Sequence, residues 1–341
     1  MTAENIALLK EIFNSKSKIV LTVHTNPDGD ALGSALALNN ILQQLGNDAV
    51  VVAPNSFPGF LSWMSGSSEI MIFDQQPKHV KEVIQEADYI FSLDYNAPKR
   101  SGNLCDFIAK SPSFKVMIDH HIDPDNEFYN LSFSKLTVSS TAELVYELLE
   151  SMQLVHMITK EIAESIYVGI MTDTSSYSFS LRNPATFSIS AHLISLGVDG
   201  EKVHRLVYDT FSENRLRLLG HAINNCMMVM DAYKTAIITL SLRDLNRFNY
   251  QIGDTEGLVN YPLSMENINF AILVTERKDQ IRLSFRSKGS FSVNDFARNH
   301  FEGGGHHNAA GGNDAASLKE TVSKLLSLLP QYVHQLDYTY A

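Results

Sequence analysis

Acidic and histidine side chains stand at the ends of several apolar runs of this chain. They are His24, Asp28, Asp30, Asp94, Asp119, His120, His121 and Asp173. Carboxylate oxygens and imidazole nitrogens together suit a hard-to-borderline divalent cation such as Mn2+. If these segments converge, they offer enough ligands for two ions, and two ions acting on one phosphate group can hydrolyse it. The residue types and their spacing therefore predict a metal-dependent phosphoesterase.

Each of these motifs also has an ordinary structural explanation when it is taken alone. A histidine after a strand is more often a hydrogen-bonded structural residue than a metal ligand. The segment 26–30 (NPDGD) consists of turn-forming residues, and Asp94 or Asp173 could cap a turn or a helix. The ordered set is more informative than its parts. Three ligand-type side chains fall on one tight turn before a helix, and the single carboxylates at 94 and 173 could bridge two ions.

The elements that must position these residues alternate along the first part of the chain. Apolar runs predict buried strands over 18–24, 48–54, 87–95 and 113–121, and helical spacing predicts helices over 4–14, 31–46, 140–152, 160–173 and 183–197. This alternation predicts an α/β fold with a parallel sheet. His24, Asp94 and Asp119 end predicted strands. Because ligands bind at the carboxyl edge of such sheets, we expect these residues to converge.

The pattern changes after residue 198. A polar helical stretch over 199–226 is predicted to link two domains. Beyond it, strands are predicted over 227–242, 268–277 and 280–288, and helices over 294–301 and 316–336. The predicted organisation is thus an N-terminal parallel-sheet domain (1–198), the linker, and a smaller C-terminal α+β domain (227–341).

A glycine-rich segment, GGGHHNAAGG (303–312), is the second chemical feature. It could be a flexible loop. It could also bind a phosphate, because small residues allow close approach and backbone N–H groups can cradle an anion. Upstream, Arg282 and Arg286 share one face of a predicted strand, either exposed to solvent or directed at a ligand. Arg100 could reach a phosphate at the acidic centre, and the segment 139–141 could bind an anion or simply cap a helix.

Composition narrows the range of functions. The chain has 341 residues, 44% of them hydrophobic, and a net charge of −11, so it lacks the basic field of a protein that binds long duplexes. Its two cysteines suggest no disulfide framework. The N-terminal segment does not resemble a signal peptide, and no apolar run reaches membrane-spanning length. We therefore expect a cytoplasmic protein that does not associate with membranes.

As an ordered set, the motifs resemble those of the DHH phosphoesterase superfamily, named for the Asp-His-His that stands here at 119–121. The C-terminal part is similar to the DHHA1 domain of that family, so the predicted domains are a DHH and a DHHA1 domain.

The resemblance implies a role for each site residue. One Mn2+ would be held by His24, Asp28 and Asp94, and a second by Asp30, Asp94, His120 and Asp173, with Mg2+ as an alternative metal. A hydroxide shared by the metals would attack phosphorus, and Asp94, Asp119 and His121 would be catalytic. The resemblance also implies that the substrate contacts Arg100, Arg286, Gly303, Gly304, Gly305 and His306.

Within the family, a chain with these two domains alone resembles the short NrnA type. This resemblance implies hydrolysis of short oligoribonucleotides to mononucleotides and of 3'-phosphoadenosine 5'-phosphate to AMP. Short single-stranded RNA and nucleotide bisphosphates would then be its partners, and a homodimer is compatible with the sequence. Three alternatives stay open: a cyclic di-AMP or pApA phosphodiesterase, an exopolyphosphatase, and a nucleotide-binding regulator without catalytic activity.

Overall fold

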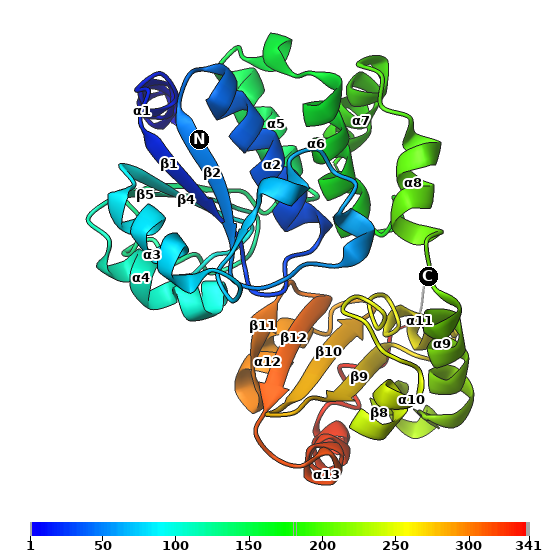
Figure 1. Cartoon of the computed structure of the whole chain (residues 1–341). Coiled ribbons are helices and arrows are strands. Elements are labelled where there is room, and N and C mark those ends of the chain that lie inside the picture. Colours follow the sequence, from blue (N-terminus) through cyan, green and yellow to red (C-terminus); the bar gives the residue numbers. More distant parts are fainter. Residues whose placement is uncertain (1, 180, 182, 339–341) are drawn as a thin grey trace. The chain divides into compact units, whose positions relative to one another are not determined.

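The computed structural model describes residues 2–179, 181 and 183–338, so the outermost ends of the two predicted domains lie outside the described residues. The chain divides into two compact units, Met1–Thr210 and Phe211–Ala341 (Figure 1). The boundary falls inside the predicted linker 199–226. That linker forms two helices, α8 (Gly200–Tyr208) and α9 (Glu213–Asn225).

The first unit is built on a six-stranded sheet in which every neighbouring pair is parallel. In the order of the sheet, the strands are β3 (Met71–Ile72), β2 (Asp48–Ala53), β1 (Lys18–Thr22), β4 (Tyr89–Leu93), β5 (Phe114–Asp119) and β6 (Leu131–Ser134). The sequence did not predict the two edge strands, β3 and β6. Strands β1 and β4 end two residues before the ends of the predicted strands, so His24 and Asp94 lie just beyond them.

Helices cover both faces of this sheet (Figure 1). They are α1 (Ala3–Phe13), α2 (Gly29–Gln44), α3 (Pro77–Glu86), α4 (Cys105–Lys110), α5 (Thr141–Ser151), α6 (Lys160–Asp173) and α7 (Ala185–Ser195). Side chains of β1 alternate between two cores. Ile19 and Leu21 pack with residues of α1, α2, α5 and α6, whereas Val20 packs with residues of α3 and α4. Burial on both faces explains why the strands are continuous apolar runs rather than alternating ones.

A glycine on α6 allows three helices to approach one another. A Cβ at Gly169 would lie 2.4 Å from the Cβ of Ala142 on α5 and 2.8 Å from Oδ1 of Asp30 on α2. A larger residue would push these helices apart. This close approach brings Asp30, the start of α5 and the end of α6, where Asp173 lies, to the same end of the unit.

The second unit contains a mixed sheet of six strands. In sheet order they are β11 (Glu302–Gly305), β12 (Ala309–Asp314), β10 (Ile281–Ser287), β9 (Phe270–Glu276), β8 (Thr235–Leu240) and β7 (Met227–Met230); β8 and β9 are parallel and the other pairs antiparallel. Its other helices are α10 (Leu242–Arg247), α11 (Asn260–Leu263), α12 (Val293–His300) and α13 (Leu318–Leu328). The predicted fold class, a parallel α/β domain followed by a smaller α+β domain, is confirmed.

Three sequence predictions for this unit were wrong in detail. The single strand predicted over 227–242 is a hairpin, because a short 3-10 turn (Asp231–Tyr233) and a left-handed residue, Lys234, reverse the chain between β7 and β8. The glycine-rich segment is a second hairpin, in which β11 pairs with β12 and only residues 306–308 form the turn. The helix predicted over 316–336 ends at Leu328, just before a 3-10 turn that contains Pro330.

Among the described residues, no helix is long and apolar enough to cross a bilayer.

Candidate metal centre

His24 follows β1 and turns its imidazole toward two carboxylates. Its Nε2 lies 3.4 Å from Oδ2 of Asp94 and 3.8 Å from Oδ1 of Asp28. Its Nδ1 lies 3.0 Å from the carbonyl oxygen of Thr25, which assigns the Nδ1 proton to that hydrogen bond and leaves Nε2 facing the acids. One ligand atom from each of His24, Asp28 and Asp94 lies within 4.8 Å of the others. These three residues form the first ligand group.

His120 directly follows β5 and faces a second set of acids. Its Nε2 lies 3.5 Å from Oδ1 of Asp94, 3.5 Å from Oδ2 of Asp173 and 3.7 Å from Oδ2 of Asp30. Ligand atoms of Asp30, Asp94 and His120 lie within 4.8 Å of one another. Asp173, the last residue of α6, borders this second ligand group through His120.

Asp94 belongs to both groups. Its Oδ2 faces His24, and its Oδ1 faces His120. The residue adopts a left-handed backbone conformation (φ 62°), which aspartate tolerates better than most residues. Its N–H donates to the carbonyl oxygen of Ile118 on β5 at 3.1 Å, which helps hold this turn in place. A buried carboxylate placed in this way can bridge two cations.

The N-terminus of α5 holds two of these carboxylates. The backbone N–H groups of Thr141 and Ala142 donate to Oδ2 and Oδ1 of Asp30 at 2.6 and 2.8 Å. The Thr141 hydroxyl donates to Oδ1 of Asp94 at 2.9 Å. The start of α5 thus binds carboxylates of the chain itself rather than an external anion. The sequence did not predict these contacts, although the Ser-Ser-Thr segment before a predicted helix was noted as a possible anion site or helix cap.

The Asp-His-His segment contains a second hydrogen-bonded pair. Oδ1 of Asp119 lies 2.7 Å from Nδ1 of His121, and Oδ2 of Asp119 accepts from the His121 N–H at 2.9 Å. Burial raises the pKa of Asp119 to about 6. Burial, and then the positive charge of Arg100, hold the pKa of His121 well below its ordinary value. The His121 imidazole is therefore neutral at neutral pH, with its orientation fixed by Asp119.

The electrostatics of the centre favour a bound cation. Burial by itself lowers the pKa of His24 and of His120, but the surrounding carboxylates outweigh it and raise both pKa values to about 10. Burial raises the pKa of Asp30, where the Asp94 charge adds to the effect. Both imidazoles thus sit in a field that stabilises positive charge. The imidazole–carboxylate distances of 3.4–3.8 Å exceed an ordinary hydrogen bond, yet they suit donors arranged around a common ion. The donor set therefore fits divalent metal ions.

The remaining predicted site residues lie in the second unit, around the hairpin turn. Arg286 is opposite Ala309 in the sheet, next to the turn that begins at His306. A Cβ at Gly303 would lie 2.2 Å from the carbonyl oxygen of Gly311. This glycine is therefore required by the neighbouring strand, independently of any ligand. The Gly305 N–H donates to the Asn294 side chain at 2.9 Å. Gly304 lies between these two glycines on β11.

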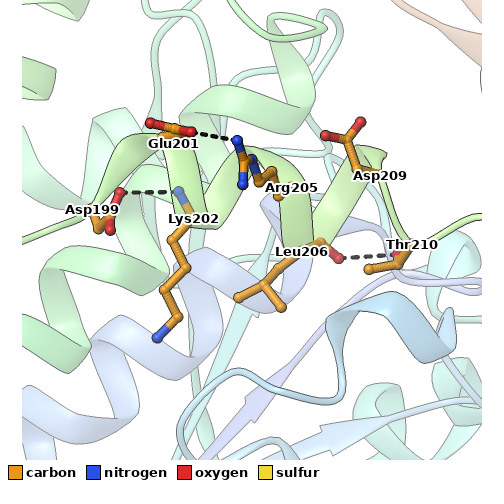
Figure 2. Close-up of a pocket in the computed structure, with 7 residues that line it drawn as sticks. All are labelled: Asp199, Glu201, Lys202, Arg205, Leu206, Asp209 and Thr210. Atoms are coloured by element: carbon orange, nitrogen blue, oxygen red, sulfur yellow. Dashed lines mark hydrogen bonds and ion pairs between the residues drawn. The ribbon is translucent and has the colours of Figure 1, made fainter.

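Figure 2 shows a pocket along α8. It is lined by Asp199, Glu201, Lys202, Arg205, Leu206, Asp209 and Thr210. None of these is a predicted site residue. Asp199 caps the helix through the Lys202 N–H, and Glu201 pairs with Arg205 one turn later at 2.6 Å. These contacts are typical of an exposed helix, so we assign the pocket no chemistry.

Comparison with protein families agrees with the residue pattern. The model of the DHH family N-terminal domain matches residues 18–170, and that of the DHHA1 domain matches residues 234–335. A crystal structure of an exopolyphosphatase-related protein from Bacteroides fragilis is 39% identical, with a TM-score of 0.92, and the match covers 99% of this chain and 98% of that one. The chain belongs to the DHH family. The predicted resemblance is thereby confirmed, as is the predicted class of enzyme, a phosphoesterase.

Two of the curated relatives of this DHH protein have names that state an activity. The bifunctional oligoribonuclease and PAP phosphatase NrnA of Thermus thermophilus is 27% identical, and the match covers 98% of this chain and 96% of that protein. The cyclic-di-AMP phosphodiesterase GdpP of Bacillus subtilis is also 27% identical over 95% of this chain, but the match covers only 49% of GdpP. The first relative thus matches along its whole length and the second along half of it.

Proposed function

We propose that this DHH protein is a Mn2+-dependent phosphoesterase that hydrolyses short oligoribonucleotides to mononucleotides and 3'-phosphoadenosine 5'-phosphate to AMP. The full-length match to NrnA supports this choice of substrates. One structural observation carries the proposed chemistry: the carboxylate of Asp94 faces two separate groups of imidazole and carboxylate ligands.

The ligand groups suggest how two metal ions would be held. His24, Asp28 and Asp94 would bind one ion, and Asp30, Asp94, His120 and Asp173 the other. Bound divalent ions would supply a Lewis acid for the phosphate and lower the pKa of water. Mixed oxygen and nitrogen donors favour Mn2+ over Ca2+, with Mg2+ as an alternative. The chain itself would hold the ligand carboxylates in place. Hydrogen bonds from the start of α5 fix two of them, Asp30 and Asp94.

We assign His121 to the reacting phosphate. Asp119 occupies Nδ1 of the imidazole, so Nε2 is the nitrogen that can face a substrate. The neutral imidazole becomes a better proton acceptor when an anionic phosphate binds beside it, because a nearby negative charge raises its pKa. His121 would then carry a proton next to the phosphate and stabilise developing negative charge. Arg100, whose charge already acts on His121, would contribute in the same way.

In the second unit, Arg286 and the hairpin of Gly303, Gly304, Gly305 and His306 are proposed to bind the nucleotide. The guanidinium group suits a phosphate through paired hydrogen bonds. Arg286 lies at the end of β10 beside the hairpin turn, so both could contact one ligand. The cytoplasmic location and the homodimer stay predictions.

A substrate panel tests the function. Purified protein in Mn2+ is given 3'-phosphoadenosine 5'-phosphate, RNA of two to five and of more than twenty nucleotides, pApA, cyclic di-AMP and polyphosphate. We expect AMP from the bisphosphate and mononucleotides from the short RNA, with slower hydrolysis of the long RNA. Asp94→Asn, which keeps the side-chain shape, should abolish both activities.

Other outcomes favour the alternatives. Preference for pApA or cyclic di-AMP would favour the dinucleotide phosphodiesterase, and release of phosphate from polyphosphate alone would favour the exopolyphosphatase. Tight nucleotide binding with no turnover of any substrate would favour the regulator and refute the catalytic proposal.

A further inference from the structure

Three potential metal ligands gather in the second unit, outside the proposed reaction. His221 lies near the end of α9, Cys226 is the residue that caps this helix, and Asp244 lies on α10. One ligand atom from each lies within 4.8 Å of the others. Nε2 of His221 is 3.1 Å from Oδ1 of Asp244. Sulfur, nitrogen and oxygen donors therefore face one small volume, which we call the α9–α10 cluster.

Contacts outside the cluster hold Asp244 and His221 in place. Oδ2 of Asp244 accepts from the backbone N–H of Ser241 at 2.9 Å and from its hydroxyl at 2.5 Å, which leaves Oδ1 directed at His221. The His221 ring packs against Phe248, with ring centroids 5.2 Å apart. Orientation of a carboxylate and an imidazole by such outer contacts is a common feature of protein metal sites.

Cys226 is anchored through its main chain. Its N–H donates to the carbonyl oxygen of Ala222 at 3.2 Å, and its carbonyl oxygen accepts from the Thr239 N–H at 3.1 Å. Both hydrogen bonds fix the Cα position where α9 ends, and they leave the thiol free of any role in secondary structure. All three donors are thus positioned by the fold before any ion binds.

The donor chemistry differs from that of the acidic centre. A thiolate with one imidazole and one carboxylate suits a borderline cation, whereas Mn2+ and Mg2+ prefer sites built mainly from oxygen. Two ligands of a tetrahedral Zn2+ at about 2.0–2.1 Å from the metal are themselves roughly 3.3 Å apart, close to the separation of His221 and Asp244. We propose that His221, Cys226 and Asp244 form a binding site for Zn2+ or a similar borderline divalent cation, with water as the fourth ligand.

Binding at this site involves no redox step. The Cys226 thiol releases its proton to the buffer, and the resulting thiolate forms a bond to the metal. Burial, and then the Asp244 charge, raise the pKa of this thiol, and a bound dication would offset both effects. Because its ligands come from α9 and α10, the ion would clamp these helices together. The site is therefore structural in this proposal and does not depend on the proposed reaction.

Co2+ provides a test, because a cysteine thiolate bound to Co2+ gives a near-ultraviolet charge-transfer band. Full-length protein, with its acidic centre filled by Mg2+, is titrated with Co2+ and then with Zn2+. The chain has only two cysteines, Cys105 and Cys226, so the band can be assigned by substitution. We expect the band in the parent and in Cys105→Ser, its loss in Cys226→Ser, and its displacement by one equivalent of Zn2+.

A second variant keeps the test valid if Cys226→Ser does not fold. His221→Gln should weaken Co2+ binding at the thiolate by at least tenfold while the circular dichroism spectrum stays that of the parent. No band in the parent at saturating Co2+, or a band that survives Cys226→Ser, would overturn the proposal. Hydrolysis in Mn2+ should be unchanged in Cys226→Ser, so failure of this site can be told apart from failure of the proposed enzyme.

Discussion

Replacing Thr141 by valine should weaken the metal centre without disturbing its neighbours. The hydroxyl of this fully buried residue donates to Oδ1 of Asp94 at 2.9 Å, while its backbone N–H separately holds Asp30. Valine keeps the size and branching of the side chain and the N–H contact. The substitution therefore removes one hydrogen bond, made to the carboxylate that faces both ligand groups.

The expected magnitude follows from this contact. A hydrogen bond to a charged group contributes about 1.5–3 kcal/mol. Loss of a residue that hydrogen-bonds to a metal ligand typically lowers metal affinity or activity by roughly 10–100-fold, which corresponds to about 1.4–2.8 kcal/mol. The two estimates agree. We expect Thr141→Val to raise the Mn2+ concentration for half-maximal activity, or to lower kcat, by a factor in this range.

The assay is AMP release from 3'-phosphoadenosine 5'-phosphate as a function of Mn2+ concentration, with thermal unfolding measured in parallel. Thr141→Ser keeps the hydroxyl and is the matched control, which should stay within about threefold of the parent because its hydrogen bond is retained. If valine leaves both kcat and the Mn2+ dependence unchanged, or if serine loses as much as valine, the hydroxyl does not position Asp94 and the reasoning is refuted.

Three further predictions concern other parts of the site. Asp119→Asn should lower kcat by about 10–100-fold with little change in the Mn2+ concentration for half-maximal activity, because Asp119 orients His121, which is not a predicted metal ligand. A parallel loss of metal binding would contradict this prediction. Arg286→Gln should raise KM for the bisphosphate by roughly tenfold or more. The control Arg282→Gln, four residues earlier on the same strand, should leave KM unchanged. Equal KM values in the parent and in Arg286→Gln would refute the proposed contact between Arg286 and the substrate phosphate. In EDTA, the free energy of unfolding should fall as pH rises from about 6.5 toward 10. In this range the folded state still holds protons on two imidazoles whose pKa values are raised to about 10, whereas the unfolded chain releases them. Urea titrations at pH 6.5 and 8.5 with and without Mn2+ should show this fall only without metal.

The interior of the first sheet could be predicted from the sequence because its signals are local. Strands β1, β2, β4 and β5 are continuous apolar runs, and such runs mark strands that are buried on both faces. The edge strands β3 and β6 have two and four residues, which is too short for a periodic pattern. Helix α3 was missed although Val80 and Ile84 carry the i, i+4 spacing of its buried face.

The residue types of the candidate site and their grouping could be predicted, but the hydrogen bonds that hold them in place could not. The approach of His24 to Asp94 followed from the predicted parallel sheet, because β1 and β4 are parallel neighbours that end at the same edge. The contacts of Thr141 could not be predicted from its local sequence, because its partners Asp30 and Asp94 are 111 and 47 positions away in the chain. In the second unit, the requirement for Gly303 arises from its pairing with β12, which no pattern around Gly303 indicates.

Asp94 shows how the fold and the proposed chemistry depend on each other. Its left-handed backbone conformation costs an ordinary residue about 1–2 kcal/mol, and glycine would adopt it more easily. Glycine, however, would remove the carboxylate that faces both ligand groups. The left-handed residue of the turn after β4 is therefore the proposed bridging ligand, and hydrogen bonds from Thr141 and to Ile118 hold it in place. The proposed metal centre would account for an aspartate at this position, because aspartate tolerates the left-handed conformation better than most residues and supplies the carboxylate that faces both ligand groups.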